Sequence, residues 1–203
     1  MAESFTLVLA TRNPGKVAEM RDLLADLPVR LIPADALDAP PDVEEDAPTL
    51  RGNARKKADA LHRHTGHPAL ADDTGLEVEA LDGAPGVHTA RFAGPDATPA
   101  DNNEQLLQAL QDADTRRARF RTVVAFVDGK DVHDFEGVCE GSIAEAPRGE
   151  MGFGYDPLFV PEGEQQTFAE MSAAQKNAIS HRRRALHQFA AFLQARLEAR
   201  TRS

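Results

Sequence analysis

Two adjacent carboxylates, Asp72 and Asp73, lie between a short apolar segment and a glycine in the sequence Ala71-Asp-Asp-Thr-Gly75. Neighbouring side chains of an extended chain point to opposite sides, so only one carboxylate can face a given ligand, and the other supports it or caps a loop. Carboxylates at a strand end suit Mg²⁺, which binds substrate phosphates through one or two such groups. The segment therefore predicts either part of a magnesium–phosphate site or an Asx turn.

A second segment with possible chemistry follows the first apolar run. Residues 5–10 predict a buried strand and residues 17–24 an amphipathic helix, with Thr11-Arg12-Asn13-Pro14-Gly15-Lys16 between them. Asn13 can cap the helix, and Pro14 suits its first turn. Backbone N–H groups, the helix N-terminus and Lys16 then point to one place, which favours a phosphate. The Walker A spacing is absent, and the alternative is an ordinary capped helix with an exposed lysine.

An acidic segment occupies residues 33–48 and includes Glu44-Glu45-Asp46. It is short and lies between predicted elements, so we interpret it as a surface loop. A run of charges is usually a solvated surface. The alternative is that a carboxylate of this loop completes the metal site begun by Asp73.

Two aromatic side chains lie among glycines in Gly152-Phe-Gly-Tyr-Asp-Pro157, in a chain with 5% aromatic residues. Such a segment can offer a flat surface to a base or sugar ring, and stacking of a base contributes about 1–3 kcal/mol. The alternative is a turn whose aromatic side chains fill the core.

A basic cluster, Lys176 with Ser180-His181-Arg182, lies in the helical region 172–200. On one straight helix, residues six apart lie about 120° from each other, so Lys176 and Arg182 could not easily reach one small ligand. A break near Ser180, a good N-cap, would let them converge. The alternative is a long solvated helix with basic residues.

The remaining pattern predicts a mixed α/β domain. The strand at residues 68–71 is expected to end at Asp72–Gly75, and Asp128-Gly129 signals a hairpin. The other predicted strands cover residues 29–32, 76–81, 120–127, 132–143 and 158–160, and the other helices cover residues 49–64 and 98–111.

Composition excludes several classes of protein. The net charge of −10 over 203 residues disfavours binding of polymeric nucleic acid. The single cysteine, Cys139, excludes an internal disulfide framework and suits a reducing compartment. The N-terminus lacks a basic signal-peptide region, and no run of eighteen apolar residues predicts a membrane span. We therefore expect a cytoplasmic protein.

Four of these five segments resemble, in order and spacing, those of the non-canonical purine nucleoside triphosphate pyrophosphatases, the inosine triphosphatase or Ham1-like family. They are Thr11-x-Asn13-x-x-Lys16, Ala71-Asp-Asp-Thr-Gly75, Gly152-Phe-Gly-Tyr-Asp-Pro157 and Ser180-His-Arg182. The resemblance covers about Leu7 to Leu197. It implies Mg²⁺-dependent hydrolysis of dITP, ITP and XTP to the monophosphate and pyrophosphate. It also implies a homodimer, and one domain over residues 1–203 with two lobes around a long curved mixed β-sheet flanked by helices. The active site is expected in the cleft between the lobes.

By position, the resemblance implies that Asp73 is the general base and a metal ligand, with Glu45 near the metal. It further implies that Lys57 reaches the phosphates and that Thr74 contacts the substrate. The residues implied around the triphosphate are Thr11, Arg12, Asn13, Pro14, Gly15 and Lys16, and those around the base and sugar are Phe153, Gly154, Tyr155, Asp156, Lys176, His181 and Arg182. One departure is Gly52, where the family usually carries a glutamate.

Two other functions compete with this interpretation. A septum-formation-inhibitor (Maf) type pyrophosphatase shares the strand–loop–helix opening, but Ser180-His-Arg182 argues against it. A non-catalytic nucleotide-sensing module would need the anion loop and ring pocket but neither Asp73 nor a metal.

Overall fold

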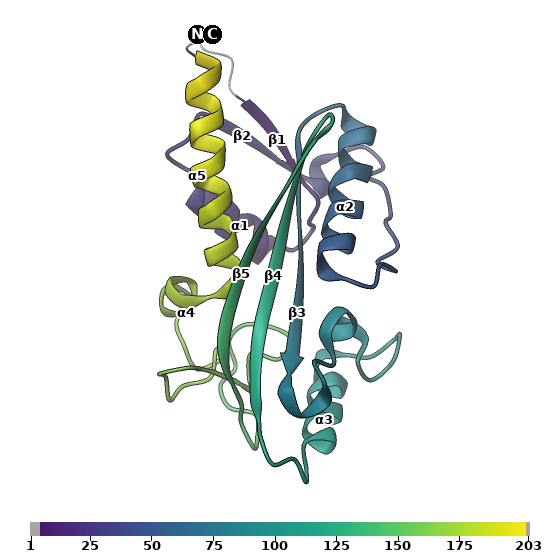
Figure 1. The fold of residues 1–203 in the computed structure, drawn as a ribbon, viewed down its shortest axis with the longest axis vertical. Coiled ribbons are helices and arrows are strands. Elements are labelled where there is room, and N and C mark those ends of the chain that lie inside the picture. Colours follow the sequence, from purple (N-terminus) through teal and green to yellow (C-terminus); the bar gives the residue numbers. More distant parts are fainter. Residues whose placement is uncertain (1–4, 202–203) are drawn as a thin grey trace. The chain divides into compact units, whose positions relative to one another are not determined.

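A computed structural model of the chain describes residues 5–201 and contains one mixed β-sheet with helices around it (Figure 1). The six strands follow the order β2-β1-β3-β4-β5-β6. Strand β1 pairs in parallel with β2 and β3, whereas β5 and β6 are antiparallel. The predicted α/β class with a mixed sheet is therefore confirmed. The strands are β1 (Phe5–Leu9), β2 (Val29–Pro33), β3 (Ala69–Val78), β4 (Arg117–Asp128), β5 (Asp131–Ile143) and β6 (Phe159–Pro161).

The α-helices are α1 (Pro14–Leu23), α2 (Leu50–Thr65), α3 (Pro99–Ala109), α4 (Ala173–Ile179) and α5 (His181–Thr201), and three short 3₁₀ turns cover Ala34–Ala36, Glu79–Leu81 and Gly86–Arg91. None of the helices within residues 5–201 is long and apolar enough to cross a membrane.

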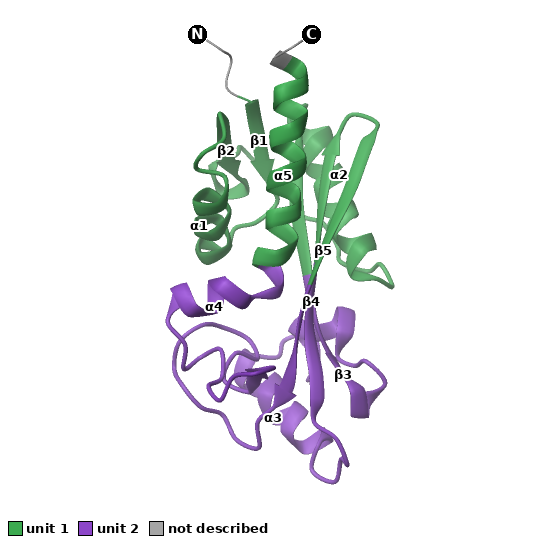
Figure 2. Ribbon diagram, turned by 60° about the vertical axis from the view of Figure 1, so that its left-hand side comes forward, with its two compact units in different colours: residues 1–73, 123–137, 183–203 green, residues 74–122, 138–182 purple. Residues whose placement is uncertain are grey.

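The chain divides into two compact units, as two lobes require (Figure 2). Unit 1 takes residues 1–73, 123–137 and 183–203, and unit 2 takes residues 74–122 and 138–182. Strands β3, β4 and β5 contribute residues to both units. Each unit has its own hydrophobic core.

In unit 1, the alternation of side chains along β1 determines which helix covers which face. Leu7 and Leu9 are fully buried and pack in one cluster with residues of α1 and α5, among them Met20 and Phe189. Val8 points to the opposite face and packs with Leu61 of α2. Helices α1 and α5 therefore cover one face of this part of the sheet and α2 covers the other.

In unit 2, aromatic rings form the centre of the core. The Phe120 and Phe159 ring centroids lie 4.7 Å apart, and those of Phe159 and Phe168 lie 5.1 Å apart. Tyr155 and Leu158 belong to the same buried cluster. The turn at residues 152–157 therefore packs on this core through Tyr155.

The predicted end of the third strand at Asp72–Gly75 is wrong. Strand β3 runs without interruption from Ala69 to Val78, and residues 69–73 are all buried. It lies between β1 and β4 in the sheet, so pairing and burial on both sides outweigh the turn preference of these residues. Consequently Asp72 and Asp73 lie within a strand and not in a loop.

The predicted break in the last helical region is confirmed. Helix α4 ends at Ile179, and Ser180 has an extended backbone with φ −66° and ψ 149° before α5 begins at His181. The two helices can therefore run in different directions.

Candidate active site

The first turn of α1 has the capped geometry that the sequence predicts. The Asn13 side-chain oxygen accepts hydrogen bonds from the backbone N–H groups of Gly15 at 2.9 Å and Lys16 at 3.3 Å. Thr11 accepts in turn from the Asn13 N–H at 3.1 Å, and Pro14 is the first helical residue. The cap therefore occupies the N–H groups of Gly15 and Lys16.

Lys16 of α1 forms an ion pair with Asp72 of β3. Its Nζ lies 2.8 Å from a carboxylate oxygen of Asp72, whose side chain is only 1% exposed. The Lys16 side chain is 20% exposed, so the alternative of a freely solvated lysine does not hold. Asp72 thus fixes an ammonium group beside the N-terminus of α1.

Asp73 faces the other side of β3, toward α2. The Lys57 Nζ lies 2.9 Å from Glu45 and 3.6 Å from Asp73, so two carboxylates share one ammonium group. Burial raises the pKa of Asp73 to about 6; Glu45 and Asp72 add to the rise, whereas Lys57 and Asn53 oppose it. Burial by itself would lower the pKa of Lys57, but the three carboxylates raise it, and the lysine stays charged.

A cavity of about 360 Å³ in unit 1 brings the residues of these segments together, and its volume is within the usual range for small-molecule sites. Four segments contribute to it: the start of α1 with the loop before it, the acidic loop, helix α2 and strand β3. Among the residues that line it are Thr11, Arg12, Asn13, Lys16, Glu45, Lys57 and Asp72.

The carboxylates of unit 1 fit a magnesium ion that arrives with phosphate ligands. Glu45 and Asp73 already converge on one cation, the Lys57 ammonium group. Within residues 5–201 no group of three or more His, Cys, Asp or Glu side chains could hold a metal, so an all-protein cage is not formed. Mg²⁺ does not need one, because it commonly uses one or two carboxylates and takes its other ligands from phosphate and water.

In unit 2, the turn at residues 152–157 presents one aromatic ring. Phe153 is 49% exposed, whereas Asp156 is buried and accepts hydrogen bonds from the Phe153 N–H at 2.8 Å and from Lys176 Nζ at 2.6 Å. Lys176 Nζ lies 4.9 Å from the Phe153 ring centroid, and Arg182 Cζ lies 5.8 Å from it. The break at Ser180 therefore does bring both cations to one place.

Two further predicted residues of unit 2 are buried. Tyr155 is 2% exposed and its hydroxyl donates to the Thr89 carbonyl at 3.0 Å, so this ring fills the core as the alternative interpretation held. His181 stacks on Phe120 with ring centroids 4.7 Å apart and an interplanar angle of 18°. Both residues support the segments that carry Phe153 and Arg182.

The structure adds a residue that the sequence reasoning missed. Thr122 is fully buried in β4, and its hydroxyl lies 2.6 Å from that of Thr74, within hydrogen-bond distance. The available signal was a threonine beside the strongest apolar run of the chain, residues 123–127. Thr122 thereby helps to orient the Thr74 hydroxyl.

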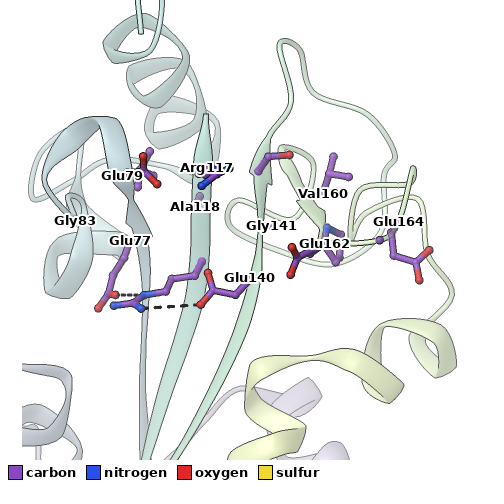
Figure 3. Close-up of a pocket in the computed structure, with 15 residues that line it drawn as sticks. Glu77, Glu79, Gly83, Arg117, Ala118, Glu140, Gly141, Val160, Glu162 and Glu164 are labelled. Atoms are coloured by element: carbon purple, nitrogen blue, oxygen red, sulfur yellow. Dashed lines mark hydrogen bonds and ion pairs between the residues drawn. The ribbon is translucent and has the colours of Figure 1, made fainter. Parts of the chain in front are cut away.

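A larger cavity of about 730 Å³ lies in unit 2, along strands β3 to β6 (Figure 3). Arg119 of β4 forms an ion pair with Glu77 of β3 at 2.6 Å, and a guanidinium nitrogen of Arg119 lies 4.0 Å from a carboxylate oxygen of Glu140 of β5. No residue predicted to bind substrate is among the described residues that line it. Size alone therefore does not identify the functional cavity.

The fold and these contacts define an α/β protein with a pocket lined by cations and carboxylates in one unit and an exposed aromatic ring flanked by cations in the other. A match to the Ham1 family covers residues 7–192, and the chain belongs to this family.

Proteins of similar sequence and structure are named either as Ham1 proteins or as dITP/XTP pyrophosphatases. A dITP/XTP pyrophosphatase of Porphyromonas gingivalis is 49% identical over 188 residues, which is 92% of this chain and 96% of the relative. The solved structure of a HAM1 protein from Coxiella burnetii has a TM-score of 0.89 at 43% identity and covers 94% of this chain and 99% of its own. A nucleoside-triphosphatase, dITP/XTP pyrophosphatase, of Mycobacterium abscessus has a TM-score of 0.77 at 39% identity over 91% of this chain and 98% of its own.

Proposed function

We propose that this protein hydrolyses the non-canonical purine nucleoside triphosphates dITP, ITP and XTP to the monophosphate and pyrophosphate. The observation that carries the proposal is the pair of carboxylates, Glu45 and Asp73, that converge on Lys57 beside the cavity at the start of α1. The names of the relatives support the same activity.

The triphosphate is held by the residues Thr11 to Lys16 together with Lys57. The substrate carries about four negative charges, and the chain has a net charge of −10. Long-range attraction is therefore weak, and nearby cations must offset the phosphate charge at contact distance, where screening by salt is small. Lys16 is already held in place by Asp72, which limits the entropy lost when it binds a phosphate.

Asp73 accepts the proton of the attacking water. As the water oxygen bonds to the α-phosphorus, the bond from that phosphorus to the bridging oxygen breaks and pyrophosphate leaves. A pKa near 6 keeps Asp73 ionised at neutral pH yet makes it a stronger base than an ordinary aspartate. When bound by Glu45 and Asp73, Mg²⁺ supplies neutralisation of phosphate charge and stabilises the leaving group.

The base and sugar are held by Phe153, Gly154, Lys176 and Arg182, and Thr74 contacts the substrate. The buried side chains of Tyr155, Asp156 and His181 support this surface. Phe153 supplies an exposed face for stacking. The Arg182 guanidinium has only donors, which favour the O6 acceptor of a 6-oxo purine. An adenine amino group at that place would leave buried donors unpaired, at about 1–3 kcal/mol each.

The homodimer and the cytoplasmic location implied by the resemblance belong to the same proposal. Light scattering coupled to gel filtration tests the dimer directly, because it reports mass independently of shape. A mass equal to that of one 22.0 kDa chain at micromolar concentration would contradict it.

The decisive experiment measures pyrophosphate release from a panel of nucleoside triphosphates with Mg²⁺ and with EDTA. We expect release from dITP, ITP and XTP, much slower release from ATP and GTP, and none with EDTA. A preference for pyrimidine or modified nucleotides would support the Maf-type alternative. Tight nucleotide binding without release would instead indicate a non-catalytic sensor.

A further inference from the structure

A buried asparagine joins the acidic loop to helix α2. Asn53 is 1% exposed, and its Oδ1 accepts a hydrogen bond at 2.9 Å from the backbone N–H of Ala47. Ala47 lies two residues beyond Glu45 in the loop. The position of the loop carboxylate therefore depends on a contact made from the first turn of α2.

Gly52, which precedes the asparagine, allows the loop to come this close. A Cβ at Gly52 would lie 2.7 Å from the Ala47 Cβ and 3.1 Å from the Thr49 hydroxyl oxygen. Carbon atoms of two side chains do not approach to 2.7 Å without movement of one of them. Gly52 is thus matched to the close packing of this loop.

The second polar atom of Asn53 is not used by the loop. Asn53 Nδ2 is buried and has no close hydrogen-bond partner within residues 5–201. Asn53 and Lys57 are four residues apart on α2 and share one face of the helix.

A second asparagine shows what a purely structural contact of this kind looks like. Asn102 occupies the corresponding position in α3, four residues after a threonine N-cap, as Asn53 does in α2. Its Oδ1 accepts from the Ala93 N–H at 2.8 Å, and its Nδ2 donates to the Ala90 carbonyl at 3.1 Å. Backbone groups satisfy both atoms of Asn102, whereas within residues 5–201 the buried Asn53 amide nitrogen has no close hydrogen-bond partner.

We propose that Asn53 is a positioning residue that sets the placement of Glu45 relative to Asp73 and Lys57, and thereby prepares the two carboxylates for a divalent cation. The inference rests on the proposed function, because the cation is the one that a nucleoside triphosphate would bring. Gly52 contributes to this placement, because the absence of a side chain there lets the loop approach the helix.

The test measures Mn²⁺ binding by electron paramagnetic resonance in the presence of the α,β-imido analogue of ITP, alongside thermal unfolding and steady-state kinetics. We expect Asn53→Ala to weaken Mn²⁺ binding at least fivefold and to lower kcat more than it changes KM for ITP. Asn53→Asp keeps an acceptor for the Ala47 N–H, and we expect it to bind Mn²⁺ no more weakly than the unmodified protein.

Asn102→Ala is the matched control and should lower thermal stability without affecting Mn²⁺ binding. Gly52→Ala tests the proposal if Asn53→Ala does not fold: it favours the helix intrinsically but displaces Ala47, so Mn²⁺ binding should weaken while the helix persists. Unchanged Mn²⁺ binding in folded Asn53→Ala or in Gly52→Ala would overturn the inference. Absence of pyrophosphate release from the unmodified protein would instead overturn the proposed function.

Discussion

At the scale of single residues, two adjacent aspartates have different surroundings because they face opposite sides of one strand. Asp72 has its own cation, Lys16, at 2.8 Å. Asp73 shares Lys57 with Glu45, and its distance to the ammonium group is longer, 3.6 Å. The shared cation only partly offsets burial, so Asp73 keeps a raised pKa, as the proposed role of a general base requires.

We expect Asp73→Asn to lower kcat for ITP by at least about 100-fold, the lower range for loss of a general base. The amide is close in size to the carboxylate, so the fold should persist. Steady-state pyrophosphate release is the measurement. Asp26→Asn removes an exposed carboxylate of the same unit and serves as the control. Near-normal turnover of a folded Asp73→Asn variant would remove Asp73 from this role.

The same group makes stability depend on pH. Below about pH 3.8 the Asp73 carboxyl is protonated in both the folded and unfolded chain, whereas above about pH 6 it is ionised in both and the folded state bears the cost of burying the charge. Without metal, Asp73→Asn should therefore increase the free energy of unfolding at pH 7.5 by about 1–3 kcal/mol more than at pH 4. Urea unfolding in EDTA measures this difference, and equal effects at both pH values would contradict it.

Arg182 is expected to distinguish bases through its donors. In Arg182→Ala the ratio of kcat/KM for ITP to that for ATP should fall by about 5- to 150-fold, which corresponds to about 1–3 kcal/mol for the unpaired groups. Both substrates are measured under the same conditions, so a general loss of activity cancels in the ratio. An unchanged ratio would assign base selection to other donors.

At the scale of elements, the turn at residues 152–157 depends on a glycine without a Cβ. Gly152 has φ +82°, and a Cβ there would meet the buried Asp156 carboxylate. We expect Gly152→Ala to displace Asp156 and with it Lys176, and so to raise KM for ITP more than it changes kcat. Gly163→Ala is the control, because Gly163 has φ +84° but open space around it. If both variants change KM equally, backbone strain and not the lost contact is responsible.

The sequence predicted elements best where local chemistry determines them. Asn13 was predicted as a cap and the helix break was predicted at Ser180, because caps depend on residues close in sequence. Strand β3 was predicted to end too early, because its continuation depends on pairing with distant strands. The contacts of Asp72, Thr122 and Asn53 could not be predicted either, since each joins side chains or segments from separate elements.

At the scale of the whole molecule, the proposed function requires that one nucleotide be recognised by two groups of residues. In that proposal the cations near the start of α1 bind phosphate and the ring of Phe153 binds the base. The net charge of −10 gives no general attraction for anions, so loss of either group should weaken binding of the complete substrate.

Fragments of the substrate separate the two contributions. Lys16→Met combined with Asp72→Asn removes both charges of one ion pair and leaves no buried carboxylate uncompensated. This double variant should raise the inhibition constant of tripolyphosphate by about 10- to 150-fold, as expected for a lost charged hydrogen bond.

Phe153→Ala should leave the inhibition constant of tripolyphosphate unchanged but raise KM for ITP by about 5- to 150-fold, as expected for lost stacking. Inosine lacks phosphates, so its inhibition constant should rise in Phe153→Ala and stay unchanged in the Lys16→Met, Asp72→Asn double variant. If Phe153→Ala weakened the binding of tripolyphosphate as strongly as that of ITP, the aromatic ring would contribute to phosphate binding. The assignment of base recognition to unit 2 would then be wrong.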